Sequence, residues 1–385
     1  MESIQQIFDD NIFNFFKSYP KEIKKVKVFK HIIGCRNGNK AFLTTCPNCG
    51  HQSYGLTNCG DRHCPVCSSR KNELFITKEK SKLLPVNYYH ITFTVPHQVN
   101  DLFYHNQELL YNILFKSAIG ALKEVLSNDK YMGADKIGVT AILHTWGSNL
   151  CYHPHLHTCL AGVGLDNKGN VVKPKNESYI FPAAVIQKIF KSIFLKELNE
   201  NIDKLNTSFD DLFFMKDFLI ELSKKEFIVN IRDTMTNPNS VINYFARYAN
   251  RVCISKSKIV DYDRENNNVT FKYKDYKDNS KIKEMTLNSL EFMRRFSLHI
   301  LPERFRKIRS YGFLAPADDK LLLLLAEKLH TKLSIIKLRK LPILCKYCST
   351  EVNLILVSVD DIHQIINDNI QTFKEGRDSY EKLIL

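Results

Sequence analysis

The spacing of apolar residues predicts helices along much of the chain. In residues 3–18 apolar side chains recur every three or four positions, the period of an amphipathic helix, and the pattern stops before Pro20. A second, basic helix is predicted at about 21–33. The remaining segments with this periodicity are 98–127, 182–223, 239–250 and 287–301, and the tail 317–385 is expected to be helical and then mixed.

Short runs of β-branched and aromatic residues predict strands between these helices. Two of the runs are expected to form a hairpin joined by a polar loop, and two others a small basic hairpin. Helices that alternate with such strands predict an α+β fold, in which an antiparallel sheet carries helices on one face. In chain order, the predicted strands cover residues 87–96, 137–146 with 155–163, 227–232, and 252–255 with 269–274.

The basic residues are concentrated in two segments. The chain has 55 Lys and Arg residues and 41 Asp and Glu residues, a net charge of +14. Residues 1–85 and residues 251–310 each carry an excess of seven basic residues, and the rest is neutral. This distribution is typical of proteins that bind a polyanion such as nucleic acid, although a lysine-rich solvated surface gives the same balance.

Two features of the sequence favour a cytoplasmic protein. No apolar run approaches the roughly 18 residues that a membrane-spanning helix needs. The first residues are acidic, where a signal peptide would be basic.

In such a protein, clustered cysteines indicate a metal site more than disulfides. Six of the 11 cysteines fall between Cys35 and Cys67. Cys46-Pro-Asn-Cys49 and Cys64-Pro-Val-Cys67 are two C-x-x-C knuckles with 14 residues between them. This spacing predicts one structural zinc with four thiolate ligands and no open position, the alternative being unliganded thiols.

Other cysteines and one histidine are further candidate ligands. Cys35, Cys59 and His63 lie in the same segment and are able to form or complete a second site, although their spacing matches no common pattern. Cys345 and Cys348 form another knuckle without a second half in the sequence, so unliganded thiols and a metal half-site both remain open. A zinc-stabilised module here is expected to direct basic side chains toward DNA, namely Arg62, Arg70 and Lys71.

The segment His153-Pro-His155-Leu-His157 predicts a divalent-cation site. In a strand, His155 and His157 point to one face and Leu156 points to the core behind them. His144, at the end of the preceding strand of the hairpin, is placed to supply a third ligand. His153 is the weaker candidate because it lies at the strand entry. Exposed histidines on a polar hairpin are the alternative.

The helix predicted at 239–250 carries two tyrosines. Tyr244 and Tyr248 lie one turn apart on the same face, and Arg247 beside them is able to neutralise a phosphate. A phenol is a weak nucleophile unless its target is polarised, and a metal on the histidine strand would polarise a phosphate. Taken alone, such a tyrosine pair is usually part of an apolar core.

Together these motifs resemble those of rolling-circle insertion-sequence transposases of the HUH class with two tyrosines. The resemblance covers about residues 30–315, and several motifs occur in the same order. They read CPNCG…NCGDRHCPVC, LLPVNYYHITFTVP, LHTWGSNLCYHPHLHTCLAGVGL, YFARYANRVCIS and RFSLHILPERFRKIRSYGFLAP.

The resemblance implies a HUH endonuclease-type sheet with a zinc-binding module before it. His155-Leu156-His157 matches the HUH element, and Tyr244 and Tyr248 match the two nucleophiles. Cys46, Cys49, Cys64 and Cys67 match the zinc-binding domain, whereas His144 rests on hairpin geometry alone. The expected domains are a zinc-binding DNA-binding module, a nuclease domain with the tyrosine helix, a basic DNA-contacting region, and a C-terminal region of unknown role, at 1–80, 85–255, 256–315 and 316–385.

The resemblance also implies a mechanism. Mg²⁺ or Mn²⁺ on the histidines polarises a phosphate at a single-stranded or hairpin element end. A tyrosine attacks it, which leaves a 5′-phosphotyrosine and a 3′-hydroxyl that primes replication, so host replication proteins are expected partners in the nucleoid. No Walker-type loop is present, in keeping with chemistry that needs no nucleotide cofactor.

Two alternatives remain. A plasmid or phage replication initiator or relaxase would use the same chemistry, but zinc knuckles ahead of the nuclease domain favour a transposase. A non-catalytic zinc-dependent DNA-binding protein is the other, and the intact histidines and tyrosines argue against it.

Overall fold

The structure is a computed structural model, and it divides into two compact units. The terminal unit comprises residues 1–68 and 338–385, and the central unit comprises residues 69–337. The described residues are 4–36, 40–206, 212–249, 251–276, 278–337, 342–353 and 355–358.

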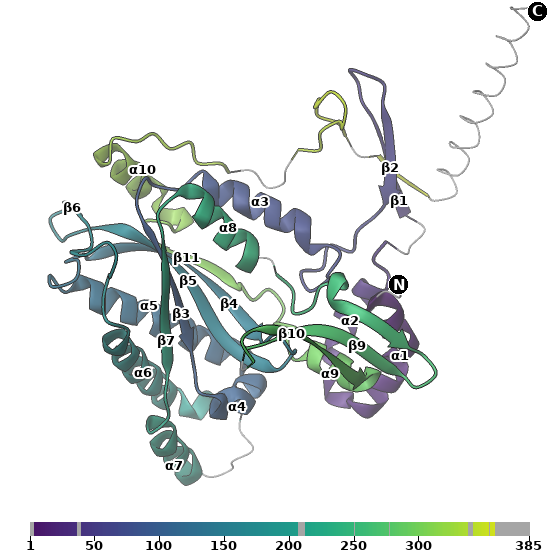
Figure 1. Cartoon of the computed structure of the whole chain (residues 1–385), viewed down its shortest axis with the longest axis horizontal. Coiled ribbons are helices and arrows are strands. Elements are labelled where there is room, and N and C mark those ends of the chain that lie inside the picture. The colour runs from purple at the N-terminus through teal and green to yellow at the C-terminus, as the bar shows by residue number, and fades with distance from the viewer. Residues whose placement is uncertain are drawn as a thin grey trace, which may run out of the picture. The chain divides into compact units, whose positions relative to one another are not determined.

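A six-stranded antiparallel sheet forms the middle of the central unit (Figure 1). Its order is β11-β4-β5-β3-β7, and the short strand β6 pairs with β5. Strands β3, β4, β5 and β7 coincide with four predicted strands, whereas the basic edge strand β11 was not predicted. The strands are β3 (Tyr88–Thr94), β4 (Lys136–Trp146), β5 (Tyr152–Leu165), β6 (Val171–Val172), β7 (Ile228–Met235) and β11 (Ile308–Gly312).

Four helices cover the first face of this sheet. Leu156 and Leu160 of β5 point to this face and are buried with Leu114 and Phe190 in the larger apolar core. Helices α5 and α6 lie side by side along the sheet, as Figure 1 shows. The helices are α4 (Asn100–His105), α5 (Gln107–Ser127), α6 (Ala183–Glu200) and α7 (Leu212–Ser223).

A second core lies on the opposite face, where Cys159 and Ala161 of β5 pack with Tyr244 and Phe245 of α8. Helices therefore lie on both faces, although the order of elements predicted one. The reason is that β5 is buried almost throughout, as in a strand with apolar contacts on both sides. The helices on this face are α3 (Ser68–Lys80), α8 (Pro238–Tyr248) and α10 (Asp319–Lys328).

The central unit also contains a small sheet of order β10-β9-β8. Helix α9 follows it, and the Phe292 ring of this helix lies 5.8 Å from the Phe271 ring of β9. The predicted strand at 252–255 is wrong, because β9 pairs with β8 and β10 instead and residues 252–255 form no strand. These elements are β8 (Ile259–Asp263), β9 (Asn268–Asp275), β10 (Lys281–Asn288) and α9 (Ser289–Ser297).

The terminal unit combines a helical part with a three-stranded sheet. The Phe29 ring lies 4.9 Å from Phe8 and 5.3 Å from Phe15, which joins the helices through an aromatic core. The sheet has the order β12-β1-β2, so its first strand comes from the far end of the chain. The elements are α1 (Ile4–Ser18), the 3-10 helix Pro20–Lys25, α2 (Val26–Ile33), β1 (Lys40–Thr45), β2 (Gln52–Leu56) and β12 (Ile355–Ser358).

These sheets and helices confirm the predicted α+β class with antiparallel sheets. The predicted domain boundaries stay predictions. Among the described residues, no helix is long and apolar enough to cross a membrane. Short 3-10 helices occur in the connections of the central unit, at His97–Val99, Ile202–Lys204, Lys256–Lys258 and Pro316–Asp318.

The pairing of β11 with β4 predicts an unusually large effect for Gly312→Ala. Gly312 has φ +57°, and an added Cβ would lie 1.7 Å from the Ile137 carbonyl oxygen. Gly169→Ala is the matched control, because Gly169 has φ +79° and open space around it. We expect Gly312→Ala to lower the free energy of unfolding by more than about 3 kcal/mol and Gly169→Ala by about 1 kcal/mol.

Fluorescence of Trp146, the single tryptophan, follows urea unfolding of the central unit alone. Equal losses in the two variants would contradict the close approach of β11 and β4.

Candidate active site

The histidines of β5 lie on the sheet face that α8 covers. Side chains alternate across a strand, so the burial of Leu156 in the first core directs His155 and His157 to the other face. In the antiparallel pairing of β4 with β5, His144 lies opposite His155. The structure therefore brings together the three predicted histidines.

His144, His155 and His157, here called the histidine cluster, offer ring nitrogens that all lie within 4.8 Å of one another. Nε2 of His155 and Nε2 of His157 are 3.1 Å apart. Two ligand atoms at right angles, each about 2.1 Å from an octahedral cation, are about 3.0 Å apart. Among the described residues no carboxylate belongs to this group. The donor set therefore fits a divalent cation held by neutral imidazoles.

Hydrogen bonds to backbone carbonyls fix two of the rings. His155 donates from Nδ1 to the carbonyl of His153 at 2.7 Å, which leaves its Nε2 free. His144 donates from Nε2 to the carbonyl of Tyr248 at 2.8 Å, which leaves its Nδ1 free. Such second bonds set the tautomer of a ligating histidine. His153, the weaker candidate, is not part of the cluster and contributes its carbonyl instead.

A fourth histidine, His90 of β3, was missed by the sequence analysis. Its Nε2 lies 3.0 Å from Nδ1 of His157. When Nε2 of His157 is used as a ligand, Nδ1 of His157 donates to His90, which thus orients the ligand. The sequence feature that could have identified His90 is its position in the predicted strand 87–96, on the same face as Tyr88 and Thr92.

Burial keeps these imidazoles neutral near pH 7. It lowers the pKa of His155 to about 4 and that of His90 to about 3. The pKa values of His144 and His157 are well below the ordinary value, first through burial and then through neighbouring histidines. Neutral imidazole is the form that binds a metal.

The tyrosine helix α8 lies against this cluster. Asn237 caps the helix by accepting from the Ser240 N–H, and Pro238 begins it. The ring centroid of Tyr248 lies 4.1 Å from that of His157. Tyr244 lies one turn earlier in the helix, and its ring centroid is 4.7 Å from that of His90.

The two tyrosines differ in environment. Tyr244 is 1% exposed, whereas Tyr248 is half-buried. Within the described part of the chain, the Tyr244 hydroxyl has no hydrogen-bond partner. Burial raises its pKa well above the ordinary value for tyrosine.

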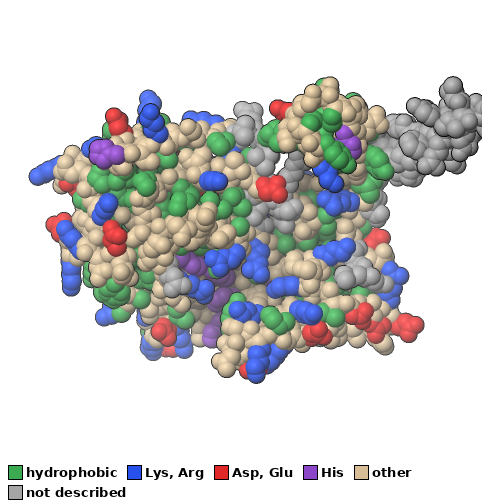
Figure 2. Space-filling model, turned by 45° about the horizontal axis from the view of Figure 1, so that its top comes forward, with side chains coloured by type: hydrophobic (Ala, Val, Ile, Leu, Met, Phe, Trp, Pro, Cys, Tyr) green, Lys and Arg blue, Asp and Glu red, His purple; other side chains and the backbone are tan. Residues whose placement is uncertain are grey.

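Cationic side chains surround the histidines. Arg232 and Arg247 lower the pKa of His90, and Lys307 and Arg251 lower that of His144, in each case after burial. Arg247 is exposed, and its guanidinium lies 5.9 Å from the centroid of the Tyr248 ring. Figure 2 shows histidine side chains at the surface with Lys and Arg side chains beside them. This electrostatic setting favours a phosphate.

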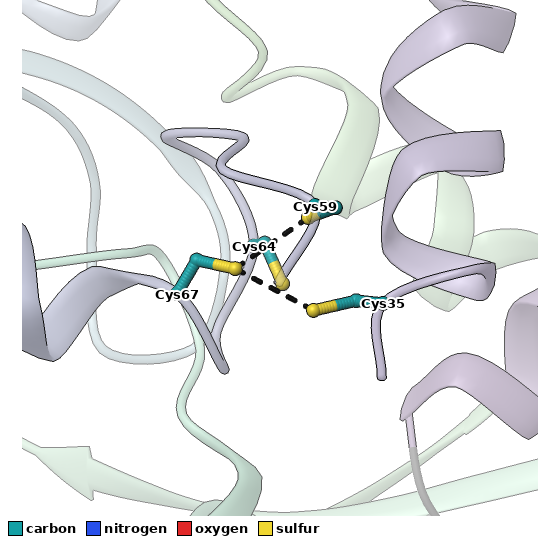
Figure 3. A group of neighbouring side chains, drawn as sticks. All are labelled: Cys35, Cys59, Cys64 and Cys67. Atoms are coloured by element: carbon teal, nitrogen blue, oxygen red, sulfur yellow. Dashed lines mark hydrogen bonds between the residues drawn. The ribbon is translucent and has the colours of Figure 1, made fainter. Parts of the chain in front are cut away.

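The cysteines of the terminal unit form two clusters. The first cysteine cluster consists of Cys35, Cys59, Cys64 and Cys67 (Figure 3). Cys67 Sγ lies 3.4 Å from Cys35 Sγ and 3.6 Å from Cys59 Sγ. The sulfur atoms of a tetrahedral zinc–thiolate site are about 3.8 Å apart, close to these distances.

The second cysteine cluster consists of Cys46, Cys49, Cys345 and Cys348. Its members are buried or half-buried, except for the exposed Cys49.

The prediction that Cys46, Cys49, Cys64 and Cys67 share one zinc is therefore wrong. Cys46 and Cys49 lie in the turn between β1 and β2, whereas Cys64 and Cys67 follow β2. Cys64 and Cys67 meet Cys35 and Cys59 at the open end of this hairpin, where the Arg36 N–H donates to the Thr57 carbonyl. The turn with Cys46 and Cys49 lies at the other end of β2, a strand that spans about 17 Å.

The other predicted residues of this region have different positions. His63 is not in a cysteine cluster, and its Nδ1 contacts Asp61 at 3.0 Å. Arg62 is half-buried next to Asp61. Arg70 and Lys71 lie in α3, but their side chains are outside the part that the structure describes.

Two family models match the chain. One, described as "Putative transposase", matches residues 138–320, and the other, "Transposase zinc-binding domain", matches residues 7–95. "Putative transposase y4qJ" of Sinorhizobium fredii is 36% identical over 280 residues, 71% of this chain and 69% of that relative. The transposase for insertion sequence element IS801 of Pseudomonas savastanoi is 27% identical over 278 residues, 70% of this chain and 65% of its own length. The chain belongs to the IS91/IS801 family of transposases.

In this transposase, the histidine cluster and the tyrosine helix lie within the segment that matches the transposase model. The first cysteine cluster lies within the zinc-binding domain, and together the match and the clusters support structural zinc. Cys345 and Cys348 lie outside both matched segments. The match spans just under two thirds of the IS801 relative's length. No solved structure matches the chain.

The geometry of the cluster predicts that His144→Ala weakens divalent-cation binding. Loss of one imidazole from three should raise the Kd for Mn²⁺ by at least about tenfold, as measured by electron paramagnetic resonance of free Mn²⁺. His97→Ala is the control, since His97 is exposed in the same unit and outside the cluster. If His144→Ala binds Mn²⁺ like the control while His155→Ala does not, His144 is not a ligand.

Proposed function

We propose that this transposase cleaves and rejoins single-stranded DNA through a covalent tyrosine–DNA intermediate. His144, His155 and His157 hold a catalytic Mg²⁺ or Mn²⁺ ion, and Tyr244 and Tyr248 are the nucleophiles. The observation that carries the proposal is the packing of Tyr248 against His157, 4.1 Å between ring centroids, next to three converging imidazoles.

The bound cation supplies positive charge that polarises the scissile phosphate. The chain's own residues orient and neutralise the DNA around it. Arg232, Arg247, Arg251 and Lys307 are the cations near the histidines, and they suit a phosphodiester backbone. Helix α8 holds Tyr248 at the cluster, and the His144 hydrogen bond to the Tyr248 carbonyl fixes the last turn of this helix.

In the proposed reaction, the tyrosine hydroxyl attacks the phosphorus and the bond to the 3′-oxygen breaks. The products are a 5′-phosphotyrosine and a free 3′-hydroxyl. Because the new phosphodiester bond conserves the energy of the old one, rejoining needs no nucleotide. The 3′-hydroxyl is a primer for host replication proteins, which makes them partners in this proposal.

The first cysteine cluster is proposed to hold the structural zinc of the matched zinc-binding domain. Its four thiolates leave no open position, so this zinc stabilises the fold rather than acting in chemistry. Arg62 next to this cluster, with Arg70 and Lys71 of α3, is proposed to contact DNA at hairpin or single-stranded element ends.

The proposal is tested with labelled single-stranded oligonucleotides that cover the DNA flanking the element. We expect a protein–DNA adduct that survives SDS, requires Mn²⁺ and is lost in EDTA. Tyr244→Phe with Tyr248→Phe should lower adduct formation by at least about a thousandfold with little effect on DNA binding, because both nucleophiles are gone. Tyr179→Phe is the matched control, since Tyr179 is exposed in the same unit.

Each other outcome has a distinct meaning. Cleavage without an adduct would indicate a hydrolytic nuclease. Tight DNA binding without cleavage would favour a binding protein. An adduct that persists in the double variant would overturn the assignment of the nucleophiles.

The environments of the two tyrosines predict unequal single variants. Tyr248→Phe should abolish the adduct of the first cleavage, because Tyr248 is the tyrosine packed on His157. Tyr244→Phe should keep this adduct within about tenfold of wild type. It should not lower the melting temperature, since it removes a buried hydroxyl that has no partner among the described residues. Equal loss of the first adduct in both variants would contradict the proposal that Tyr248 attacks first.

A further inference from the structure

The second cysteine cluster lies outside the proposed DNA chemistry. Its sulfur atoms come from two knuckles that are about 300 residues apart in sequence. Cys46 Sγ lies 3.4 Å from Cys348 Sγ, and Cys49 Sγ lies 3.5 Å from both Cys345 Sγ and Cys348 Sγ. These distances are far above the roughly 2.05 Å of a disulfide bond and near the roughly 3.8 Å between sulfurs on one zinc ion.

The two knuckles have the same backbone fold. In the first, the Gly50 N–H donates to the Cys46 carbonyl and the Cys46 N–H donates to the His51 carbonyl, both at 2.9 Å. In the second, the Ser349 N–H donates to the Cys345 carbonyl at 3.0 Å and the Cys345 N–H donates to the Thr350 carbonyl at 2.8 Å.

The residue after the second cysteine is left-handed in both knuckles. Gly50 has φ +69°, which glycine adopts freely, and Ser349 has φ +58°, which costs a non-glycine residue energy. The two turns therefore share this backbone conformation as well as their hydrogen bonds.

Backbone N–H groups also point at the sulfur atoms. The His51 N–H donates to Cys49, and the equivalent Thr350 N–H donates to Cys348. Such donors stabilise thiolate charge, as is needed when four thiolates meet on one cation. The ring of His51 lies 4.3 Å from that of Tyr347, so the two turns also contact each other beside the sulfur atoms.

We propose that the second cysteine cluster is a second structural zinc site, which joins the C-terminal knuckle to the β1–β2 hairpin. The matched zinc-binding domain ends at residue 95 and thus contains only one half of this site. Four thiolates in a tetrahedral arrangement suit zinc, and no position is left open for catalysis.

The site has a structural consequence for the sheet. After Cys348 the chain returns to the hairpin as β12, where Ala41 pairs with Val357 and Leu43 with Ile355. This sheet has little apolar burial of its own: β2 has no buried residue, and Leu356 is 72% exposed. The second zinc therefore holds β12 on β1.

The test is the zinc content of the full-length protein, measured by mass spectrometry of the metal ions. Every chain carries His155→Ala and His157→Ala, so that zinc at the histidine cluster is not counted. We expect two zinc ions in this reference chain and one when Cys345→Ser and Cys348→Ser are added. Cys151→Ser is the control and should keep two, since Cys151 lies outside both clusters. One zinc in the reference chain, or two in the chain with both Cys→Ser changes, would overturn the proposal.

Two further measurements test the proposal in case the double cysteine variant folds poorly. Titration of the metal-free wild type with Co²⁺ should saturate the visible absorption of tetrahedral Co²⁺–tetrathiolate at two equivalents, and saturation at one would count against the second site. In the double variant, hydrogen exchange of the β1 amides should speed up by at least about tenfold, while that of β3 and β5 stays unchanged. Unchanged protection of β1 would mean that the cluster does not hold β12.

Discussion

The candidate active site depends on the register between β4 and β5. In this antiparallel pair, His144 lies opposite His155 and Leu143 lies opposite Leu156. Because side chains alternate across a strand, burial of the two leucines under the helices of the first face forces the histidines to the second face. A slip of one residue would exchange the two sets, so apolar packing on one face fixes the geometry of the histidine cluster on the other.

The burial of α8 positions the two tyrosines on the second face. Tyr244 and Phe245 pack into the second core, and this contact sets the rotation of the helix. Tyr248, one turn beyond Tyr244, then meets the His157 ring, and its carbonyl accepts a hydrogen bond from His144. The last turn of α8 and the histidine cluster are thus one hydrogen-bonded structure, and a displacement of His144 would move Tyr248.

Features of the fold and site that depend on residues close in sequence could be predicted, whereas those that depend on contacts between distant residues could not. Runs of β-branched and aromatic residues predict β3, β4, β5 and β7, and hairpin geometry is enough to add His144 to the two histidines of β5. His90 lies in a predicted strand, yet its role depends on β3 pairing with β5, which is more than 60 residues away in the chain, and periodicity carries no information on that neighbour. Strands β1, β2 and β12 are missed because they have only four to six residues each, and because β1 pairs with β12 across more than 300 residues of chain.

The grouping of the cysteines also depends on contacts between distant residues, because the members of the two clusters alternate along the chain. Cys35 and Cys59 flank the β1–β2 hairpin, whose turn carries Cys46 and Cys49, so the knuckle nearest in sequence is the wrong partner. In the proposed second zinc site, thiolate–metal bonds would do for this sheet what apolar packing does for the central unit, since a sheet that buries so few side chains has little other source of stability. If both clusters hold zinc as proposed, the zinc supply and the redox state of the thiols would govern the stability of this sheet, whereas the helical part of the terminal unit has its own aromatic core and the central unit has two apolar cores.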